Sequence, residues 1–590
     1  MKYVKIYILF LSFVMATGCK KLDIPPVNIL KDEDVFSTDA GVGAYMVPIY
    51  FNLPIEDFKY NFSGGFNQFP PFPALGLFTA EMLQADYVFR GSIESGSFGY
   101  WPYGDIRKIN YLLETLPANA SNFSKEQSDA YLGEAHFLRA YFYFDLVKRY
   151  GGVPIVKVPQ DPFNATAEEL RIPRSTEEEV YKFVEDELNQ AIALMPATAS
   201  IVKGRANRDV ALALKSRVML YAATIAKYGS IQLNGLLGIP ASQARDYFQK
   251  SYDAAVALEG KYTLYRGNAD KYQNYVNLFF DRNSSENIFI KDYKYPDMTH
   301  SWDALNAPKQ FVNGYGSFVQ PTLDYVELYG ELQVNNASGF PIRFDQRADL
   351  FKNVEPRLRA TVILPGDSFR GELIDVQRGI YPTYVNGDEA ANNAALRIAG
   401  NQDVLYNGKR VIGLSGVGGS GTQTGFFIRK YQNSNLPQSD LALGRSDQAW
   451  IDMRYAEILL NKAEAGVELG TAETTSKALT AINDIRDRAG ATLLTALTLE
   501  NVRLERRKEL AFENHSWWDM RRWRTADKEF NNRIYKVLFP YYIFNENKYI
   551  FKKEDEMSKS RFTFQLRFYY EPIPGGEINR NPQLVQNPLY

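Results

Sequence analysis

The sequence predicts a mainly α protein in which pairs of helices form a scaffold and a loop-rich insertion carries short β segments. Three observations support this prediction. Apolar residues recur at helical spacing through much of the first 260 residues and again after residue 450. Small residues recur where the helices of tetratricopeptide-like pairs would cross. Residues 261–445 lack the helical spacing and are rich in Tyr, Asn and Gly.

On this pattern the chain divides into four parts. Residues 1–18 form a signal peptide, and residues 19–260 form an N-terminal helical region. Residues 261–449 form a loop-rich region, and residues 450–590 form a C-terminal helical region that ends in a Pro-rich tail. The roughly 570 residues after the signal peptide are enough to bury more than one sizeable core.

The N-terminus has the features of a secretory signal that ends in a lipid-attachment site. Lys2 and Lys5 form a short cationic head before an apolar run over residues 6–15, which is too short to span a bilayer. Small residues at 16–18 come directly before Cys19, the only cysteine of the chain, as in a bacterial lipobox. We therefore expect export and acylation of Cys19, so that acyl chains tether the body to a membrane. The alternative is an ordinary signal peptide followed by a cysteine by chance.

The N-terminal region is predicted to hold five long helices, after a connector with a short helix at residues 40–50. Within residues 207–228, for example, Ala211, Leu214 and Val218 follow one another at spacings of three and four, as a helix packed on one side requires. Two of the helices end at a glycine, which can adopt the left-handed conformation that closes a helix. The two glycines are Gly151 and Gly229. The five helices are residues 103–116, 125–150, 175–194, 207–228 and 242–258.

The loop-rich region contains short β-like runs, such as residues 287–290, and a glycine-rich loop at residues 413–422. Helical spacing returns at residues 450–469, 475–488 and 499–514. We expect the tail to end in a Pro-rich coil.

The charge and the motifs argue against several classes of function. A net charge of −2 is unlike that of a nucleic-acid-binding protein, which needs a concentrated basic surface. His136, His300 and His515 lie far apart without zinc-site spacing, and no nucleotide-binding or hydrolase motif is present. Residues 281–285 resemble the start of a calcium loop, but Glu286 stands where that loop needs glycine. No cofactor is therefore expected, with calcium at residues 281–285 as the alternative.

The densest charge cluster lies at residues 503–522 and contains three acids one helical turn apart. The three acids are Glu505, Glu509 and Glu513. A glycosidase needs two carboxylates that face each other across a substrate, roughly 5 to 9.5 Å apart and normally on different elements. Three acids on one face among many arginines instead indicate an ion-pair network. A second polar stripe, on residues 454–464, is expected to find its partners in Arg486 and Arg488 of the next helix.

Aromatic residues make up 14% of the chain, including 39 tyrosines, and indicate a binding surface. Trp and Tyr rings stack on the apolar C–H faces of sugars, while their polar edges bond hydroxyls. Rings next to Gly, Pro or Asn, outside the helical stripes, are the best candidates for ligand contact, because loops commonly carry binding residues. Each ring has the alternative of packing in the core. The candidates are Tyr87, Phe89, Trp101, Tyr293, Tyr295, Trp302, Tyr315 and Phe318.

Several segments together resemble the SusD/RagB family of Bacteroidetes outer-membrane nutrient-binding lipoproteins. The resemblance spans nearly the whole chain and implies a scaffold of tetratricopeptide-like helix pairs with a loop-rich ligand-binding portion at 261–449. It also implies docking, as a lid, on a SusC-like TonB-dependent outer-membrane transporter. The segments are residues 19–25, 134–154, 453–465, 482–490, 505–513 and 572–582.

The resemblance leaves three functions to weigh. The first is a lipid-anchored protein of the outer membrane, facing the exterior, that captures oligosaccharides and passes them to the transporter. The second keeps this scaffold but takes peptides. The third is a glycan-cleaving enzyme, for which the sequence shows no opposed acid pair. Because the shared motifs belong to the scaffold, the candidate rings depend on their chemistry alone.

Overall fold

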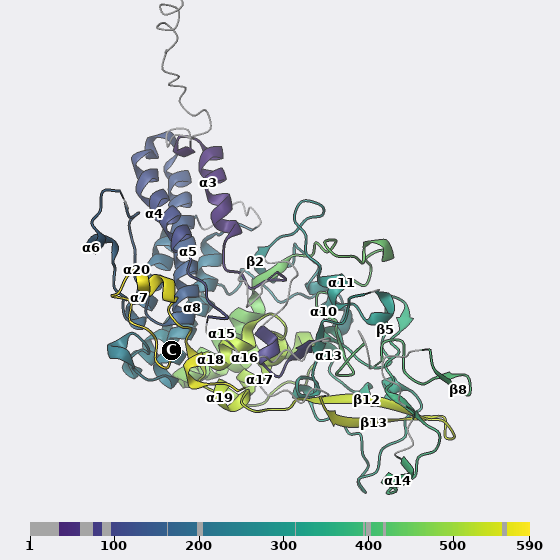
Figure 1. Ribbon diagram of the computed structural model, residues 1–590. Helices are drawn as coiled ribbons and strands as arrows, with labels where there is room; N and C mark the ends of the chain where they lie inside the picture. The colour runs from purple at the N-terminus through teal and green to yellow at the C-terminus, as the bar shows by residue number, and fades with distance from the viewer. Residues whose placement is uncertain are drawn as a thin grey trace, which may run out of the picture.

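A computed structural model gives the fold of the chain (Figure 1). It describes residues 35–59, 75–84, 96–161, 163–196, 204–312, 314–392, 396, 403–416, 421–556 and 563–590. The predicted signal peptide, Cys19, Tyr87 and Phe89 lie outside these residues. Figure 1 shows a helical half, formed by the N-terminal helices and α15–α18, beside a loop-rich half that contains α10–α14 and the longest strands. The prediction of a mainly α fold with a loop-rich insertion is confirmed.

The five long N-terminal helices are present, and their ends differ from the predicted ends by at most two residues. Side-chain caps explain several starts: Ser124 and Gln127 form a capping box at α5, and Thr176 and Glu179 form one at α7. Asn207 caps α8. No helix of the described residues is both long and apolar enough to cross a membrane. The helices are α3 (Asp39–Phe51), α4 (Tyr103–Ala118), α5 (Lys125–Tyr150), α6 (Ala167–Leu170), α7 (Glu177–Leu194), α8 (Arg208–Tyr228) and α9 (Ala244–Val256).

The helices pack in pairs, as the small residues predicted. Helix α5 packs against α7, and α8 packs against α9. Helix α15 (Tyr455–Leu469) packs against α16 (Ala472–Ala489) and also contacts α8 and α9, so the C-terminal pair continues the N-terminal stack. Ala135, Ala222 and Ala463 are completely buried, which lets the helix backbones approach closely.

The two glycines that end helices act differently. Gly151, after α5, has φ of 71° and ψ of −136°, a positive φ that favours glycine but lies outside the left-handed helical conformation that was predicted. Gly229, after α8, has φ of −82°, so the prediction of a left-handed cap is wrong there. A Cβ atom at Gly229 would lie 2.5 Å from the Ile225 carbonyl oxygen. Glycine is therefore required at 229 because of close approach rather than because of φ.

Two predicted C-terminal helices are shorter than expected. Residues 450–454 form strand β11 (Trp450–Arg454), which pairs with β2 (Asn287–Lys291) before α15 begins. The helix predicted at 499–514 ends at Glu509, because Phe512 and Asn514 have φ of 60° and 64°. The C-terminal helices after α16 are α17 (Leu499–Glu509), α18 (His515–Arg522), α19 (Ala526–Glu529) and α20 (Gly575–Arg580).

Residues 536–555, for which no strand was predicted, form a hairpin. Strands β12 (Lys536–Ile543) and β13 (Lys548–Asp555) form an antiparallel hairpin, and β7 (Gly379–Tyr381) from the loop-rich region pairs with β12 in parallel. Pro540 lies within β12, although proline cannot donate to a ladder. Its position is compatible with the sheet because the pairing with β7 starts only at Tyr541.

The remaining elements are short and lie in the loop-rich half. They are β1 (Met82–Gln84), α10 (Lys271–Leu278), α11 (Trp302–Asn306), β3 (Val319–Pro321), α12 (Leu323–Val326), α13 (Pro356–Thr361), β4 (Val362–Ile363), β5 (Ser368–Phe369), β6 (Glu372–Leu373), α14 (Glu389–Asn392), β8 (Leu405–Tyr406), β9 (Lys409–Arg410) and β10 (Phe427–Ile428).

Candidate functional site

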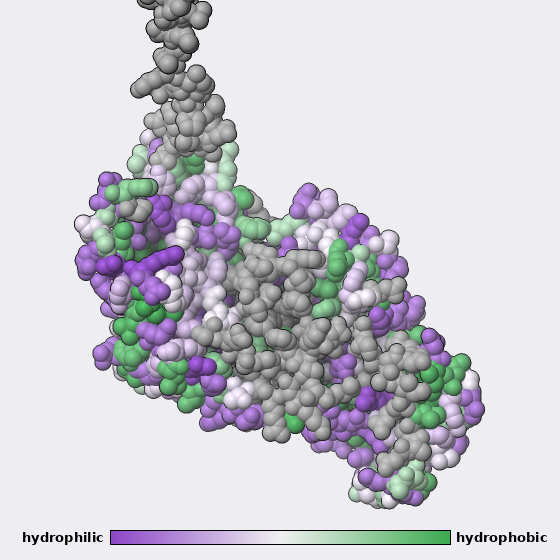
Figure 2. Space-filling model, viewed as in Figure 1, coloured by the Kyte–Doolittle hydropathy of each residue, from purple (hydrophilic) through white to green (hydrophobic). Residues whose placement is uncertain are grey.

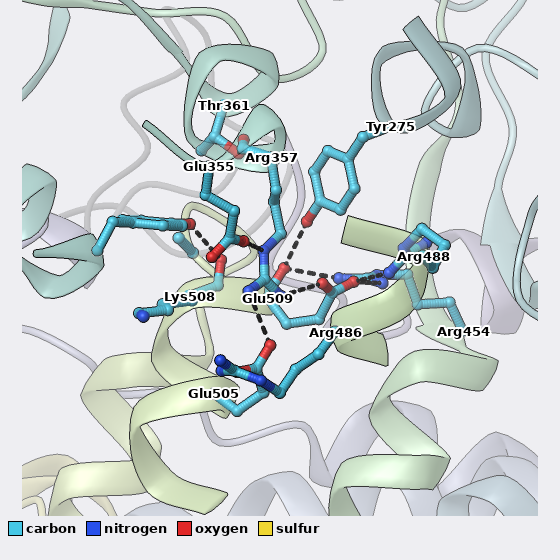
Figure 3. Close-up of polar contacts among 12 residues, drawn as sticks. Tyr275, Glu355, Arg357, Thr361, Arg454, Arg486, Arg488, Glu505, Lys508 and Glu509 are labelled. Carbon is cyan, nitrogen blue, oxygen red and sulfur yellow. Dashed lines mark hydrogen bonds and ion pairs between the residues drawn. The ribbon is translucent and has the colours of Figure 1, made fainter. Parts of the chain in front are cut away.

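The acidic cluster of α17 is a buried ion-pair network centred on Glu509 (Figure 3). One carboxylate oxygen of Glu509 lies 2.6 Å from Nη1 of Arg454 and also accepts from Arg488. The other lies 2.7 Å from Nη1 of Arg357. Burial alone would raise the pKa of Glu509, but these three arginines outweigh it and hold the pKa well below the usual range.

The other two acids of the cluster are also paired with cations. Glu505 lies 2.7 Å from Arg486, and Glu513 lies 2.6 Å from the ammonium of Lys430. A general acid needs a carboxyl group that stays protonated and reaches the substrate. Glu505 and Glu513 are buried, and Glu513 has a lowered pKa because Arg454 and Lys430 outweigh its burial. The predicted ion-pair network is therefore present.

The second polar stripe finds different partners from those predicted. Glu457 pairs with Arg217 at 2.7 Å, and Glu464 pairs with Arg522 at 2.6 Å. Arg486 instead pairs with Glu505, and Arg488 pairs with Glu509, so the predicted pairing is wrong. The stripe meets α8 and α18, which the spacing within α15 alone could not reveal.

Glu286, at the end of the calcium-like stretch, belongs to the same network. Its two oxygens lie 2.8 Å from Arg454 and 2.9 Å from Arg488. In the part of the chain that the structure describes, no group of three or more His, Cys, Asp or Glu residues is arranged to hold a metal ion.

Two of the candidate rings lie inside the protein, which corrects their assignment as ligand contacts. The side chain of Trp302 is 2% exposed, and its indole N–H donates to the Lys430 carbonyl at 3.2 Å. Tyr293 is 1% exposed, and its hydroxyl donates to Asp57. Both rings pack around Phe58, with centroid distances of 5.1 Å to Trp302 and 6.2 Å to Tyr293. Neither ring can present a free face to a ligand in this arrangement.

Tyr295 is the candidate ring that the structure leaves most open, with 44% of its surface exposed. The guanidinium of Arg445 lies over the ring at 4.8 Å from the centroid and also donates a hydrogen bond to the hydroxyl. The Tyr295 backbone N–H lies 3.4 Å from a carboxylate oxygen of Asp447. Arginine stacking and these bonds fix the orientation of an exposed ring.

Tyr315 and Phe318 follow α11 and are half-buried. The backbone of this loop is fixed to the end of α11, where the Phe318 N–H donates to the Leu305 carbonyl at 2.9 Å. At the other end of α11, the Gly444 N–H donates to the Ser301 hydroxyl and so fixes the loop that carries Arg445. We use the name α11 face for the residues of the loops at the two ends of α11, which are Tyr295 and Arg445 at its start and Tyr315 and Phe318 beyond its end.

Asp303, which sequence reasoning missed, fastens two loops to α11. Its carboxylate accepts from the Asn433 N–H at 2.6 Å and from the Gln448 side chain at 3.1 Å, and its own N–H donates to the Ser446 hydroxyl at 3.0 Å. Burial raises the pKa of Asp303 to about 6, against the hydrogen bonds that lower it. The spacing of the sequence carries no signal for this role, since its partners are more than a hundred residues away.

We expect Asp303→Asn to remove part of the pH dependence of stability. An unfolded Asp titrates near pH 4, so between about pH 4 and pH 6 the folded protein keeps a proton that the unfolded chain releases. The free energy of unfolding therefore falls as the pH rises through this window, by up to about 3 kcal/mol. Urea unfolding at pH 4 and pH 7 should show a smaller fall for the variant. Asp403→Asn, on a side chain that is 99% exposed, is the control and should match the parent protein.

Trp101 lies at a separate hollow in the helical half. It is half-buried and packs on Tyr103 and Tyr150, with centroid distances of 5.0 and 5.1 Å. Trp101 and Tyr103 line a hollow of about 360 Å³ beside α20, together with polar groups such as Arg171 and Asn581. This half carries α4 and α20, whereas α11 lies in the loop-rich half (Figure 1). The candidate rings therefore do not form one site.

The arrangement is that of a ligand-binding scaffold: stacked helix pairs, a buried ionic brace, and loops that carry an oriented ring. The chain belongs to the SusD family, whose family model matches residues 271–590. A second family model, described as starch-binding associating with outer membrane, matches residues 96–220.

The relatives cover almost the whole chain. SusD-like protein P2 from Formosa agariphila is 24% identical over 626 aligned residues, which cover 100% of this chain and 99% of that protein. A solved SusD-like protein from Bacteroides fragilis is 24% identical with a TM-score of 0.67, covering 95% of this chain and 99% of the other. Surface glycan-binding protein A from Bacteroides fluxus is 20% identical with a TM-score of 0.58, covering 94% of this chain and 100% of the other. These structures share the fold.

Proposed function

We propose that this protein is a cell-surface nutrient-binding lipoprotein that captures oligosaccharides and passes them to a SusC-like TonB-dependent transporter. Membership of the SusD family supports it, as do similar structures described as a laminarin-binding SusD-like protein and a surface glycan-binding protein. The observation that carries the proposal is Tyr295, an exposed ring that Arg445 holds in place at the α11 face. Such a ring can stack on a sugar while the arginine donates to its hydroxyls.

We place the protein at the outer membrane, attached through lipid on Cys19 and facing the exterior. The lipobox-like start of the chain supports the anchor, and the description of the second family model supports the membrane. Labelled fatty acid should be recovered on Cys19 from intact cells, and protease added outside the cells should reach the body. A chain without fatty acid would remove the anchor from this proposal.

Helix α3 supports docking on another protein. Its outward side is apolar: Val47 and Phe51 are 64% and 50% exposed, and Ala44 and Pro48 lie beside them. Hydrophobic residues are visible where α3 lies, at the top of the helical half in Figures 1 and 2. Exposed apolar helix faces of this kind commonly mark protein contacts. Co-purification of a TonB-dependent barrel with the tagged chain tests this docking.

Tyr295→Ala should weaken binding of the best glycan by about two- to tenfold, because a stacked ring contributes roughly 0.5–1.5 kcal/mol beyond area burial. A glycan array followed by calorimetry on the soluble body measures this. Phe163→Ala is the matched control, since Phe163 is 94% exposed and comes just before α6, which lies in the helical half and not beside α11 (Figure 1). Equal affinities for all three proteins would remove Tyr295 from the site.

The same screen separates the alternatives. Tight binding of peptides without binding of glycans would favour the peptide-uptake function and overturn this proposal. The burial of Glu505, Glu509 and Glu513 among cations supports binding without cleavage. Incubation with the bound glycan should therefore release no new reducing ends.

A further inference from the structure

A hollow of about 400 Å³ opens between α17 and the segment that runs from α18 to α19. Arg503 and Arg507, one turn apart on α17, line it, together with Leu499, Leu504 and Met520. Its volume falls in the range of roughly 300–1,000 Å³ that is usual for ligand pockets. We name it the Arg503 hollow.

Arg503 is held rigidly between two aromatic rings. Its guanidinium lies 5.0 Å from the ring centroid of Tyr228 and 4.8 Å from that of Trp523. The rings are fixed in turn by glutamates of α15: the indole N–H of Trp523 donates to Glu464 at 2.7 Å, and the hydroxyl of Tyr228 donates to Glu468. The arginine is therefore oriented before any ligand arrives.

Apart from these two ring contacts, Arg503 has no hydrogen bond or ion pair among the described residues. Its Nε and Nη2 atoms are enclosed but have no hydrogen-bond acceptor, and the side chain forms no ion pair. Arg506, on the same helix, shows the contrast, because it donates to Asp519 and Asn461 at 2.7 Å each. Arg507 forms no ion pair or side-chain hydrogen bond within the described chain, although its charge lowers the pKa of the buried Glu81 against the effect of burial.

An enclosed donor without an acceptor is uncommon and calls for an explanation. Residues at i and i+4 of a helix are neighbours, so Arg503 and Arg507 can both donate to one oxyanion. The leucines and Met520 supply an apolar wall that suits the C–H face of a sugar ring. The carboxylate of Glu500 also lines the hollow and competes for these cations, whereas Glu529 is engaged with Arg533 at 3.7 Å.

We propose that the Arg503 hollow is a binding subsite for an acidic sugar, whose carboxylate or sulfate is held by Arg503 and Arg507. The proposal rests on the glycan-binding function inferred above and extends it. The oriented arginine pair selects the charged group, and the apolar wall contacts the ring that carries it. The subsite makes the protein prefer anionic glycans over neutral ones.

Calorimetry with three chemically matched probes tests the subsite: a galacturonate tetramer, a neutral galactose tetramer and a sulfated galactose tetramer. The intact soluble body should bind at least one anionic probe more tightly than the neutral one. Arg503→Gln and Arg507→Gln should each weaken that binding by about tenfold, because a charged hydrogen bond is roughly twice as strong as a neutral one and several are lost. Neither change should weaken binding of the neutral probe.

Two further variants make the test specific. Glu500→Gln should tighten anionic binding about two- to threefold, since it removes a competing carboxylate at the rim. Arg266→Gln, on a side chain that is 48% exposed and outside both hollows, should change nothing. Arg507 lies outside the ring sandwich, so its variant remains informative even if Arg503→Gln lowers the unfolding midpoint.

The outcomes separate this inference from the proposed function. Equal affinity for neutral and anionic tetramers, with no effect of either arginine variant, would overturn the subsite and leave glycan capture intact. Binding of sodium sulfate as tight as that of the sulfated tetramer would overturn the sugar-specific part. Binding of no glycan of any kind would instead remove the proposed function itself.

Discussion

Glu509→Gln is expected to lower the free energy of unfolding by about 3–5 kcal/mol, because it leaves buried cations without their counter-charge. The oxygens of Glu509 meet Arg357, Arg454 and Arg488, and all four side chains are buried. An amide of the same shape must turn its NH₂ group toward one of these arginines, so attraction becomes repulsion. Urea unfolding followed by tryptophan fluorescence should show a large fall in the midpoint.

Glu473→Gln is the control for this change. Glu473 lies 2.8 Å from Lys477 on α16, but the two side chains are 75% and 51% exposed. Exposed pairs of this type contribute well under about 1 kcal/mol, so the midpoint should barely move. Similar midpoints for Glu509→Gln and Glu473→Gln would mean that the network does not brace the fold.

The same network predicts a loss of stability in acid. The pKa of Glu509 lies well below its usual range because the three arginines outweigh burial. Its contribution is complete above the unfolded pKa of about 4.3 and is lost as the pH falls toward the folded pKa. In acid, the free energy of unfolding of the parent protein should therefore approach that of Glu509→Gln.

The position of the network explains how the scaffold orients the loops. Arg357 belongs to α13 and Lys430 follows β10, both in the loop-rich half, whereas Arg454 ends β11 directly before α15 and Arg488 lies on α16. Glu509 and Glu513, at the end of α17, contact both groups. The ion-pair network therefore connects loops of the loop-rich half to the helical stack. Lys430 links it to α11 as well, because its backbone carbonyl accepts a hydrogen bond from the indole N–H of Trp302.

The helices could be predicted from the sequence because their signals are local. Residues 125–150 were expected to form a helix and α5 has those bounds, since apolar spacing, a capping box and a closing glycine all lie within the segment. The acids of residues 505–513 were likewise recognised as an ion-pair network from their spacing. Each of these signals is read within one element.

The features that were not predicted correctly depend on contacts between residues that lie far apart in the sequence. The partners of Glu457 and Glu464 come from α8 and α18, so no spacing within α15 reveals them. The hairpin of β12 and β13 was not predicted, and its Pro540 lies opposite Phe551 of β13, with the pairing to β7 starting at Tyr541. The burial of Trp302 could not be predicted for a similar reason. Helix α11 spans only Trp302–Asn306, which are too few residues for the spacing to show which side faces inward.

Trp302→Ala is therefore expected to act on stability rather than on recognition. It should lower the free energy of unfolding by about 3–5 kcal/mol, the usual cost of removing a large buried ring. The ring packs 5.1 Å from Phe58, and loss of the indole also leaves the Lys430 carbonyl without its donor at 3.2 Å. The midpoint of urea unfolding and the glycan affinity of the folded fraction are the two measurements.

Tyr295→Ala is the matched comparison, because both residues are candidate rings of the same loop-rich region. Removal of a ring that is 44% exposed should cost little stability, whereas glycan affinity should fall. Trp302→Ala should show the reverse, with a lower midpoint and near-parent affinity in the protein that stays folded. If Trp302→Ala kept the parent unfolding midpoint but weakened glycan binding, Trp302 would have to contact the ligand. The ring would then leave its packing around Phe58 when the glycan binds. The two variants thus decide whether an aromatic residue of this surface binds ligand or supports the residue that does.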